Sequence, residues 1–263
     1  MSAGHFHPAT RHTPHPRAGQ HPRALHGGRG VVSGALAAAQ SFLIEPADAP
    51  PPPAPRDAPQ ARAVIAVFGL ARGCGTTVVA RGLAAELARR DPAATAAVAC
   101  EGRTAGIPLA TQAATLLAQT LNSAIAGEAR ALGRLCLVQP ADHTRLSEAV
   151  RPLAPLVIDA GASLLGGVPA VIADAVVLVS SPAVEPALAP VARECLARVG
   201  PEPLVALNRV DWPGAGSAGS TAHAEIELPS SRMGAQLALG GREARGDLGR
   251  AIAALADRCG GMS

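Results

Sequence analysis

The residues best suited to chemistry lie in a glycine-rich loop, Gly69–Thr77, which reads GLARGCGTT. Glycine lets backbone N–H groups come close to a ligand, and the residues that follow have the apolar spacing of a helix. N–H groups at the start of a helix attract anions, phosphate above all. The loop therefore predicts an anion site between a strand and a helix.

A lysine is missing from this loop. In the usual phosphate-binding pattern, GxxxxGK[ST], a lysine reaches the β and γ phosphates and the last hydroxyl ligates Mg²⁺. Alignment of Gly75 and Thr77 with that pattern puts Thr76 in the place of the lysine, and all 23 lysine and arginine residues of the chain are arginine. An alternative interpretation is that Thr76 and Thr77 only cap the helix.

The loop needs a strand before it and a helix after it, and the sequence predicts both. Ala63–Gly69 is a short apolar run, and Thr77–Arg90 places apolar residues on one helical face. Further short apolar runs, separated mostly by helix-like segments such as Pro186–Val199, are Ala94–Cys100, Arg134–Val138, Leu156–Asp159, Ala175–Ser180 and Leu204–Asn208. This alternation predicts an α/β fold, a doubly wound and mostly parallel sheet with helices on both faces. Ligands of such sheets bind at the carboxyl ends of the strands.

The first 60 residues differ in composition from the rest of the chain. Six of the eight histidines fall within residues 1–26, and Ala47–Pro59 is rich in proline. We expect residues 1–60 to be a disordered tail and a proline-rich linker, and residues 61–263 to form one domain. The histidine spacings fix no metal geometry. Val31–Ile44 superficially resembles a signal-peptide core, but its long polar lead favours a short helix or strand.

Charge and cysteine content limit the classes of function. The net charge of +3 is small for 263 residues and aromatic residues are few, so no specific nucleic-acid binding is predicted. Five widely spaced cysteines without a CxxC pair favour a reducing compartment, which predicts a cytoplasmic protein. The longest apolar run, Val168–Val179, contains Asp174 and is too short to span a bilayer. Peripheral membrane contact stays open.

Beyond the loop, four further segments carry a family resemblance. They are LVIDAG (Leu156–Gly161), ADAVVLVSSPAVEPAL (Ala173–Leu188), VALNRV (Val205–Val210) and LPSSRMGAQLALGG (Leu228–Gly241). With the loop, they make the chain resemble the MinD/ParA P-loop ATPases from about Ala63 to Asp257. The resemblance is strongest to their TadZ/CpaE-like branch, in which loops of the ARGGVGATT type occur.

The resemblance implies roles for individual residues. Those that would bind the nucleotide phosphates are Arg72, Gly73, Cys74, Gly75, Thr76, Thr77 and Val78. Thr77 and Asp159 would hold Mg²⁺, Asn208 and Arg209 match the pair that contacts the adenine base, and Pro229 falls in the adenine-side loop. As alternatives, Asp159 is an ordinary turn residue at a strand end and Asn208 forms a local turn.

Two departures from the family concern hydrolysis. The signature lysine of the family falls on Ala71 in an ungapped alignment, or on Arg72 if the loop is one residue short. Where the family has an acidic residue that aligns the attacking water, this chain reads Ala-Cys-Glu-Gly, and Glu101 is the candidate substitute.

The resemblance and its departures together predict a degenerate P-loop protein. It would bind ATP or ADP with Mg²⁺ weakly or structurally, hydrolyse little, and act in positioning or as the scaffold of a pilus- or septum-type assembly, as a homodimer with a protein partner. One alternative is an active ATPase in which Arg72 or a partner residue replaces the lysine. Another is an interaction module that binds no nucleotide.

Overall fold

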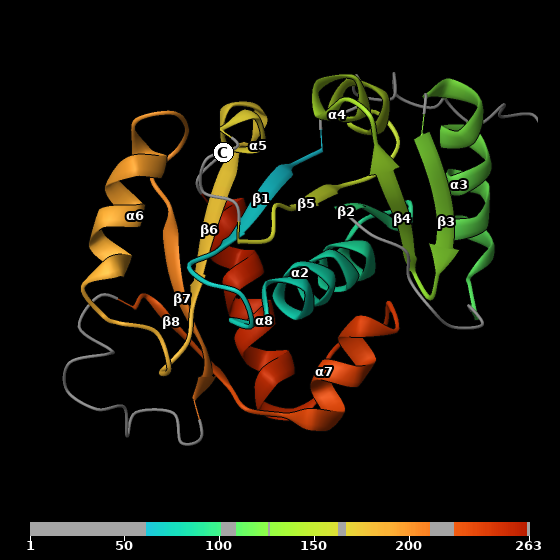
Figure 1. Cartoon of the computed structure of the whole chain (residues 1–263). Coiled ribbons are helices and arrows are strands. Elements are labelled where there is room, and N and C mark those ends of the chain that lie inside the picture. The colour runs from blue at the N-terminus through green and yellow to red at the C-terminus, as the bar shows by residue number, and fades with distance from the viewer. Residues whose placement is uncertain (1–61, 101–108, 126, 163–166, 211–223, 262–263) are drawn as a thin grey trace, which may run out of the picture. The chain divides into compact units, whose positions relative to one another are not determined.

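The computed structural model describes residues 62–100, 109–125, 127–162, 167–210 and 224–261, all within the unit Asp57–Ser263 (Figure 1). The predicted tail and linker, residues 1–60, lie outside the described residues. No helix in the described part of the chain is long and apolar enough to cross a bilayer.

The described residues build one eight-stranded sheet in the order β3-β4-β2-β5-β1-β6-β7-β8. Its strands are β1 (Val64–Gly69), β2 (Ala96–Cys100), β3 (Gly127–Leu132), β4 (Leu135–Pro140), β5 (Leu156–Asp159), β6 (Ala175–Ser180), β7 (Leu204–Val210) and β8 (Ile226–Pro229). Every neighbouring pair is parallel except β3 and β4. The predicted α/β fold with a mostly parallel sheet is confirmed.

Helices cover both faces of this sheet (Figure 1). One face packs against α2 (Thr76–Arg90) and α8 (Gly246–Gly260), with α7 (Arg232–Leu239) lying against α2. The other face carries α3 (Gln112–Ala124), α4 (His143–Val150), α5 (Val168–Ile172) and α6 (Leu188–Ala197). Strands β1, β2 and β6 are buried at every position, which explains why they read as continuous apolar runs rather than alternating ones.

Two strands were not predicted from the sequence. The edge strand β3 reads GEARAL and exposes Glu128 and Arg130, so it lacks the apolar run that marked the buried strands. The other edge strand, β8, is only four residues long. Edge strands are exposed on one side and tolerate charge, and this removes the compositional signal on which the prediction relied.

A side chain from α3 occupies the outer edge of β3 at Ala129. Asn122 donates from Nδ2 to the carbonyl of Ala129 at 2.9 Å, and its Oδ1 accepts from the backbone N–H of Ala129 at 2.8 Å. Both backbone groups of Ala129 are therefore satisfied without a further strand. An unpaired edge is a template for another chain, and the carboxamide occupies it here.

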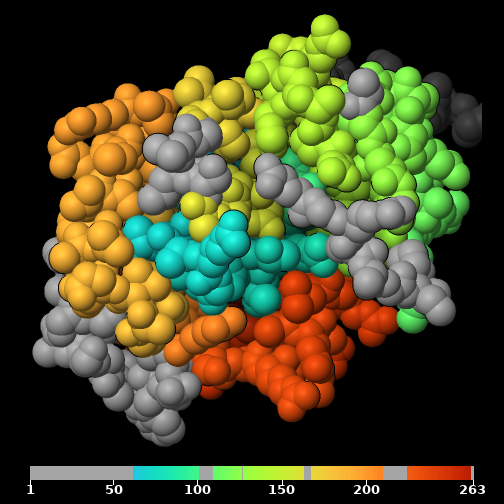
Figure 2. Space-filling model, in the orientation of Figure 1, coloured from blue at the N-terminus to red at the C-terminus, as the bar shows by residue number. Residues whose placement is uncertain are grey.

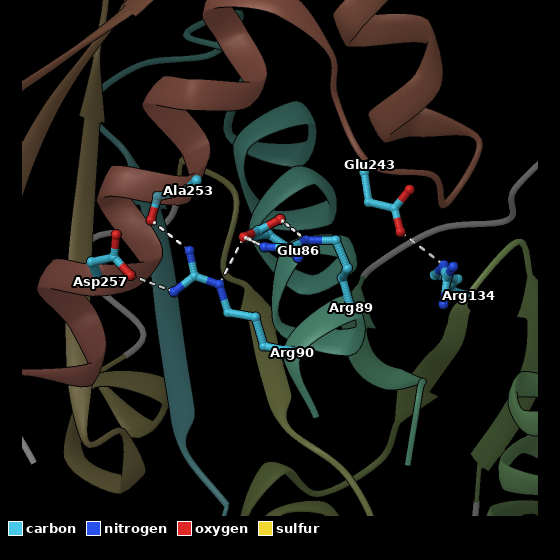
Figure 3. A network of polar contacts seen from close by, with 7 residues as sticks. All are labelled: Glu86, Arg89, Arg90, Arg134, Glu243, Ala253 and Asp257. Atoms are coloured by element: carbon cyan, nitrogen blue, oxygen red, sulfur yellow. Dashed lines mark hydrogen bonds and ion pairs between the residues drawn. The ribbon is translucent and has the colours of Figure 1, made fainter. Parts of the chain in front are cut away.

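Helix α2, which follows the loop, is joined to α8 by a network of polar contacts (Figure 3). Glu86 is 7% exposed and accepts hydrogen bonds from Arg89 at 2.6 Å and from Arg90 at 2.7 Å. Arg90 also donates to the carbonyl of Ala253 at 3.1 Å and pairs with Asp257, both on α8. The Glu86 carboxylate orients both arginines, so its charge holds the C-terminal end of α2 in place.

Replacement of Glu86 tests this network. The hydrogen bond from Arg89 holds the pKa of Glu86 below its ordinary 4.5, against the opposing effect of burial. A lowered pKa means that the stabilisation is present above the unfolded-state pKa and is lost as the pH falls through the folded-state value. Glu86→Gln should therefore reduce the free energy of unfolding by about 1–3 kcal/mol at pH 7, and by less as the pH falls.

Urea unfolding at several pH values between 7 and 3 measures this difference. Glu194→Gln is the matched control, because Glu194 pairs with Arg198 only at the surface, where both side chains are more than two thirds exposed. It should change the stability little. A Glu86→Gln deficit that stays constant with pH would contradict the role assigned to the charge.

Candidate functional site

The glycine-rich loop begins at the end of β1, between its two neighbours in the sheet, β5 and β6. The N–H of Gly69, the last residue of β1, donates to the carbonyl of Gly161 after β5 at 2.6 Å. The N–H of Leu70 donates to the carbonyl of Val179 on β6 at 2.8 Å. The loop thus begins at the carboxyl ends of the central strands, where such folds bind ligands.

Two glycines shape the loop and the helix start. Gly73 and Gly75 both have φ of 85°, a left-handed conformation that other residues adopt at a cost. Gly75 is the N-cap of α2 and provides no side-chain cap, so the interpretation of Thr76 and Thr77 as capping residues is wrong: both lie in the first turn. Within the described residues, no backbone carbonyl accepts from the N–H of Gly73, Gly75, Thr76, Thr77 or Val78. These donors are available to an anion.

The hydroxyl of Thr76 lies against the first residue of the loop. Thr76 is only 8% exposed. A Cβ built on Gly69 would lie 2.2 Å from its Oγ1, so the hydroxyl packs against the end of β1. Thr77, the predicted Mg²⁺ ligand, is half-buried in the same turn. The position of the missing lysine is therefore filled by a short, buried side chain that lies against Gly69.

Asn208 on β7 fastens the loop from the other side. It is 5% exposed, and its Nδ2 donates to the carbonyl of Cys74 at 2.7 Å, a contact between residues 134 positions apart. The interpretation of Asn208 as a local turn former is therefore wrong. A Cβ on Gly75 would lie 2.2 Å from Nδ2, so this approach requires glycine at position 75.

Arg209 and Pro229 lie beside Asn208. Arg209 is exposed and sits at a bulge of β7 with φ of 64°, and its Nε lies 4.0 Å from the Cβ position of Gly75. The buried Pro229 pairs with Val210, one step beyond the pairing of Asn208 with Leu228. The residues assigned to the adenine base by the resemblance are thus brought together next to the loop.

Asp159 ends β5 level with Val67 on β1 and with Cys100 on β2. Its Oδ1 accepts from the N–H of Gly161 at 3.2 Å, so it does form the strand-end turn named as an alternative. The second carboxylate oxygen has no hydrogen bond to any described residue. Mg²⁺ takes oxygen ligands and usually keeps water and substrate phosphate around one or two carboxylates. The donors present suit that ion, and Asp159 as its ligand remains a prediction.

Arg81 is a residue of this region that the sequence interpretation missed. It lies on α2, is 8% exposed, and donates from Nη1 to the carbonyl of Leu239 at 2.9 Å. Its Nε has no partner among the described residues. Burial raises the pKa of the Cys100 thiol, the charge of Arg81 opposes the rise and that of Asp159 adds to it. A buried cation thus lies near the end of β2. The sequence signal that could have revealed it is an arginine on the buried face of α2.

Arg72 and Glu101 are the remaining residues predicted for the site. Arg72 is exposed on the loop and forms no ion pair with the described residues. Glu101, the candidate water-aligning residue, lies outside the described residues. In the space-filling view, the segment that contains the loop and α2 is exposed between the C-terminal helices and the segments around β6 (Figure 2).

Comparison with known proteins shows which fold carries this arrangement. No family model matches the chain, and no curated protein matches it in sequence. Among solved structures, MinD from Aquifex aeolicus matches with a TM-score of 0.53 at 16% identity, covering 76% of this chain and 98% of that one. The MinC:MinD complex from the same organism gives 0.51 at 17% identity, with 76% and 97% covered. The McdA–ATP complex from Cyanothece gives 0.50 at 14% identity, with 77% and 97% covered.

At these identities the likeness shows the fold, and the chain has the fold of the MinD/ParA-like P-loop ATPases. The TadZ/CpaE-like branch is not among these three structures.

The two left-handed glycines offer a matched pair of variants. In Gly73→Ala nothing lies within 4 Å of the new Cβ, so only the backbone conformation costs free energy, about 1–2 kcal/mol. Gly75→Ala adds the clash with Asn208 and should lose the hydrogen bond to Cys74, a further cost of about 1–3 kcal/mol. Urea unfolding of both variants measures the difference. Equal losses would show that Asn208 does not fasten the loop.

Proposed function

We propose that this chain is a degenerate P-loop protein that binds ATP or ADP with Mg²⁺ weakly, hydrolyses little, and serves as a positioning or scaffold component. One observation carries the proposal. The loop keeps its glycine conformations, its free N–H groups and its contact to Asn208, while the lysine position holds a threonine turned toward Gly69. The anion site is thus retained without its central cation.

Binding survives the loss of the lysine at a reduced affinity. A hydrogen bond to a charged group is worth about 1.5–3 kcal/mol, which corresponds to a roughly 10- to 150-fold weaker nucleotide complex. Positive charge is still present in the exposed Arg72 and Arg209 beside the loop. These arginines attract phosphate, but their planar guanidinium is larger than the ammonium group that such a loop surrounds.

Hydrolysis loses more than binding does. Donors that stabilise charge in the transition state contribute about 2.7–4 kcal/mol each, and the family uses two lysines there. Thr76 is buried against β1 and cannot supply that charge. A protein that holds nucleotide but turns it over slowly acts as a sensor of nucleotide, and we propose this role for the chain within a larger assembly.

A protein partner for this chain is proposed from its structural likeness to MinD. One of the matching structures is a complex of MinD with MinC. By analogy we propose a protein partner for this chain, dimerisation across the loop, and service to a pilus- or septum-type assembly of the TadZ/CpaE-like kind. The competing function, an active ATPase, is favoured by the exposed Arg72, which forms no ion pair with the described residues and is free to approach a γ-phosphate.

Calorimetric titration of the full chain with Mg-ATP, Mg-ADP and Mg-GTP tests binding. We expect a dissociation constant in the high micromolar to millimolar range, lost in Gly75→Val. Thr76→Lys should tighten binding roughly 10- to 150-fold, whereas Thr76→Arg should not, because the guanidinium does not fit the loop. If neither the wild type nor Thr76→Lys binds any nucleotide, the loop is not a nucleotide site and the interaction-module alternative stands.

Phosphate release separates the weak binder from the active ATPase. The wild type and Arg72→Ala should both hydrolyse ATP at rates near the detection limit, with nucleotide saturating as judged by the titration. Substantial turnover by the wild type that falls on Arg72→Ala, roughly 100-fold or more, would instead favour Arg72 as the substitute for the lysine.

A further inference from the structure

Arg209 is held in an unusual backbone conformation beside the loop. Its φ is 64°, and Ala94 is the only other non-glycine residue with a positive φ in the described part of the chain. This conformation is unfavourable for a residue with a Cβ, and such outliers persist where the surrounding structure imposes them, often at functional sites. Arg209 is thus placed by its surroundings rather than by its own preference.

A bulge of β7 produces this conformation. The strand pairs with β8 at Asn208 and again at Val210, and Arg209 is the unpaired residue between them. A bulge changes the direction of the side chain that it carries. The Nε atom of Arg209 lies 4.0 Å from the position of a Cβ on Gly75. The bulge therefore brings the guanidinium beside Gly75, the N-cap of α2.

No described residue uses the hydrogen-bonding groups of the Arg209 side chain. The side chain is exposed and forms no ion pair or hydrogen bond within the described ranges. Arg193 shows the more usual state of an arginine on this protein, since it pairs with both Glu202 and Glu225. The five N–H donors of the Arg209 guanidinium are therefore free for a ligand that the loop holds.

The neighbouring Asn208 offers less to such a ligand. It is 5% exposed, and its Nδ2 donates to the carbonyl of Cys74 at 2.7 Å. Because that donor holds the loop, only Oδ1 remains, as an acceptor. The exposed and unpaired group at the end of β7 is Arg209, which provides donors and no acceptor.

A group that only donates distinguishes the two purine bases. The edge of guanine that carries N7 and O6 presents two acceptors, whereas the same edge of adenine presents the N7 acceptor and the N6 amino donor. A guanidinium can pair with both acceptors of guanine at once. On adenine it pairs with N7 alone and meets a second donor. Free donors beside the loop therefore favour guanine.

We propose that Arg209 contacts the base of a nucleotide whose phosphates occupy the loop, and that this contact makes the site prefer guanine to adenine. The inference rests on the proposed function and adds the identity of the base to it. There the adenine base comes from the family likeness, and weak binding of ATP or ADP is compatible with tighter binding of GTP or GDP. ATP and GTP carry the same phosphates, so a difference between them reports on the base.

Calorimetric titration of the full chain with the Mg²⁺ complexes of GTP, ATP, ITP and 7-deaza-GTP tests the proposal. GTP should bind at least roughly 5-fold tighter than ATP, the lower bound for one bidentate pair. Inosine keeps N7 and O6 but lacks the N2 amino group of guanine, so ITP should bind as GTP does. In 7-deaza-GTP a carbon replaces N7, and the affinity should fall toward that of ATP.

Variants of Arg209 test whether this residue makes the choice. Arg209→Ala and Arg209→Gly should both bind GTP and ATP equally. Glycine adopts the left-handed conformation without strain, so Arg209→Gly covers the case in which the alanine variant fails to fold. Arg72→Ala is the matched control, because Arg72 is an exposed arginine of the loop without an ion pair to a described residue. Its loss should weaken GTP and ATP alike and leave their ratio unchanged.

Failure of this inference differs from failure of the proposed function. If nucleotides bind but the wild type does not prefer GTP to ATP, only the assignment of the base is overturned. A preference for GTP that survives in Arg209→Gly, or one that ITP does not share, would also overturn it, since another group would then select the base. If no nucleotide binds at all, the proposed function fails and this inference fails with it.

Discussion

The hydrogen bond from Asn208 to the carbonyl of Cys74 is the contact on which the geometry of the site depends. It joins the end of β7 to a loop that otherwise connects β1 with α2, and it forms only because Gly75 has no side chain. The same glycine, in its left-handed conformation, starts α2 and leaves the first N–H groups of that helix without acceptors. Fastening the loop and exposing its donors are thus two effects of one residue type at one position.

The chain must meet every need for a fixed cation with arginine. At the surface and between helices this works well, since guanidinium forks pair with carboxylates, as Arg89 and Arg90 do around Glu86. Inside a tight loop it does not, because the group is planar and wide. The structure reflects this division: Arg72 lies on the loop and Arg209 beside it, while the lysine position holds Thr76. A loop built this way agrees with the proposed function, in which phosphate is held more than it is transferred.

Much of the fold could be predicted from the sequence, and the reasons are local. The bounds of β5 and β6 agree with the structure, because both are short apolar runs ended by a polar residue. Strands β3 and β8 were missed because sheet edges lack that signal. For the site, the sequence predicted which residues take part. The direction of the Thr76 hydroxyl and the partner of Asn208 were not predictable, because each depends on backbone that is distant in sequence or on a conformation that only the packed loop selects.

The closure of β3 by Asn122 has a consequence for the behaviour of the protein at high concentration. A carboxamide presents a donor and an acceptor much as a peptide group does, so one side chain imitates a neighbouring strand. An incoming strand must displace two hydrogen bonds that already exist, and it gains little where it replaces them. Hydrolysis of the Asn122 amide to a carboxylate, a slow chemical change of ageing proteins, would keep the acceptor for the N–H of Ala129 and leave the carbonyl of Ala129 without its donor.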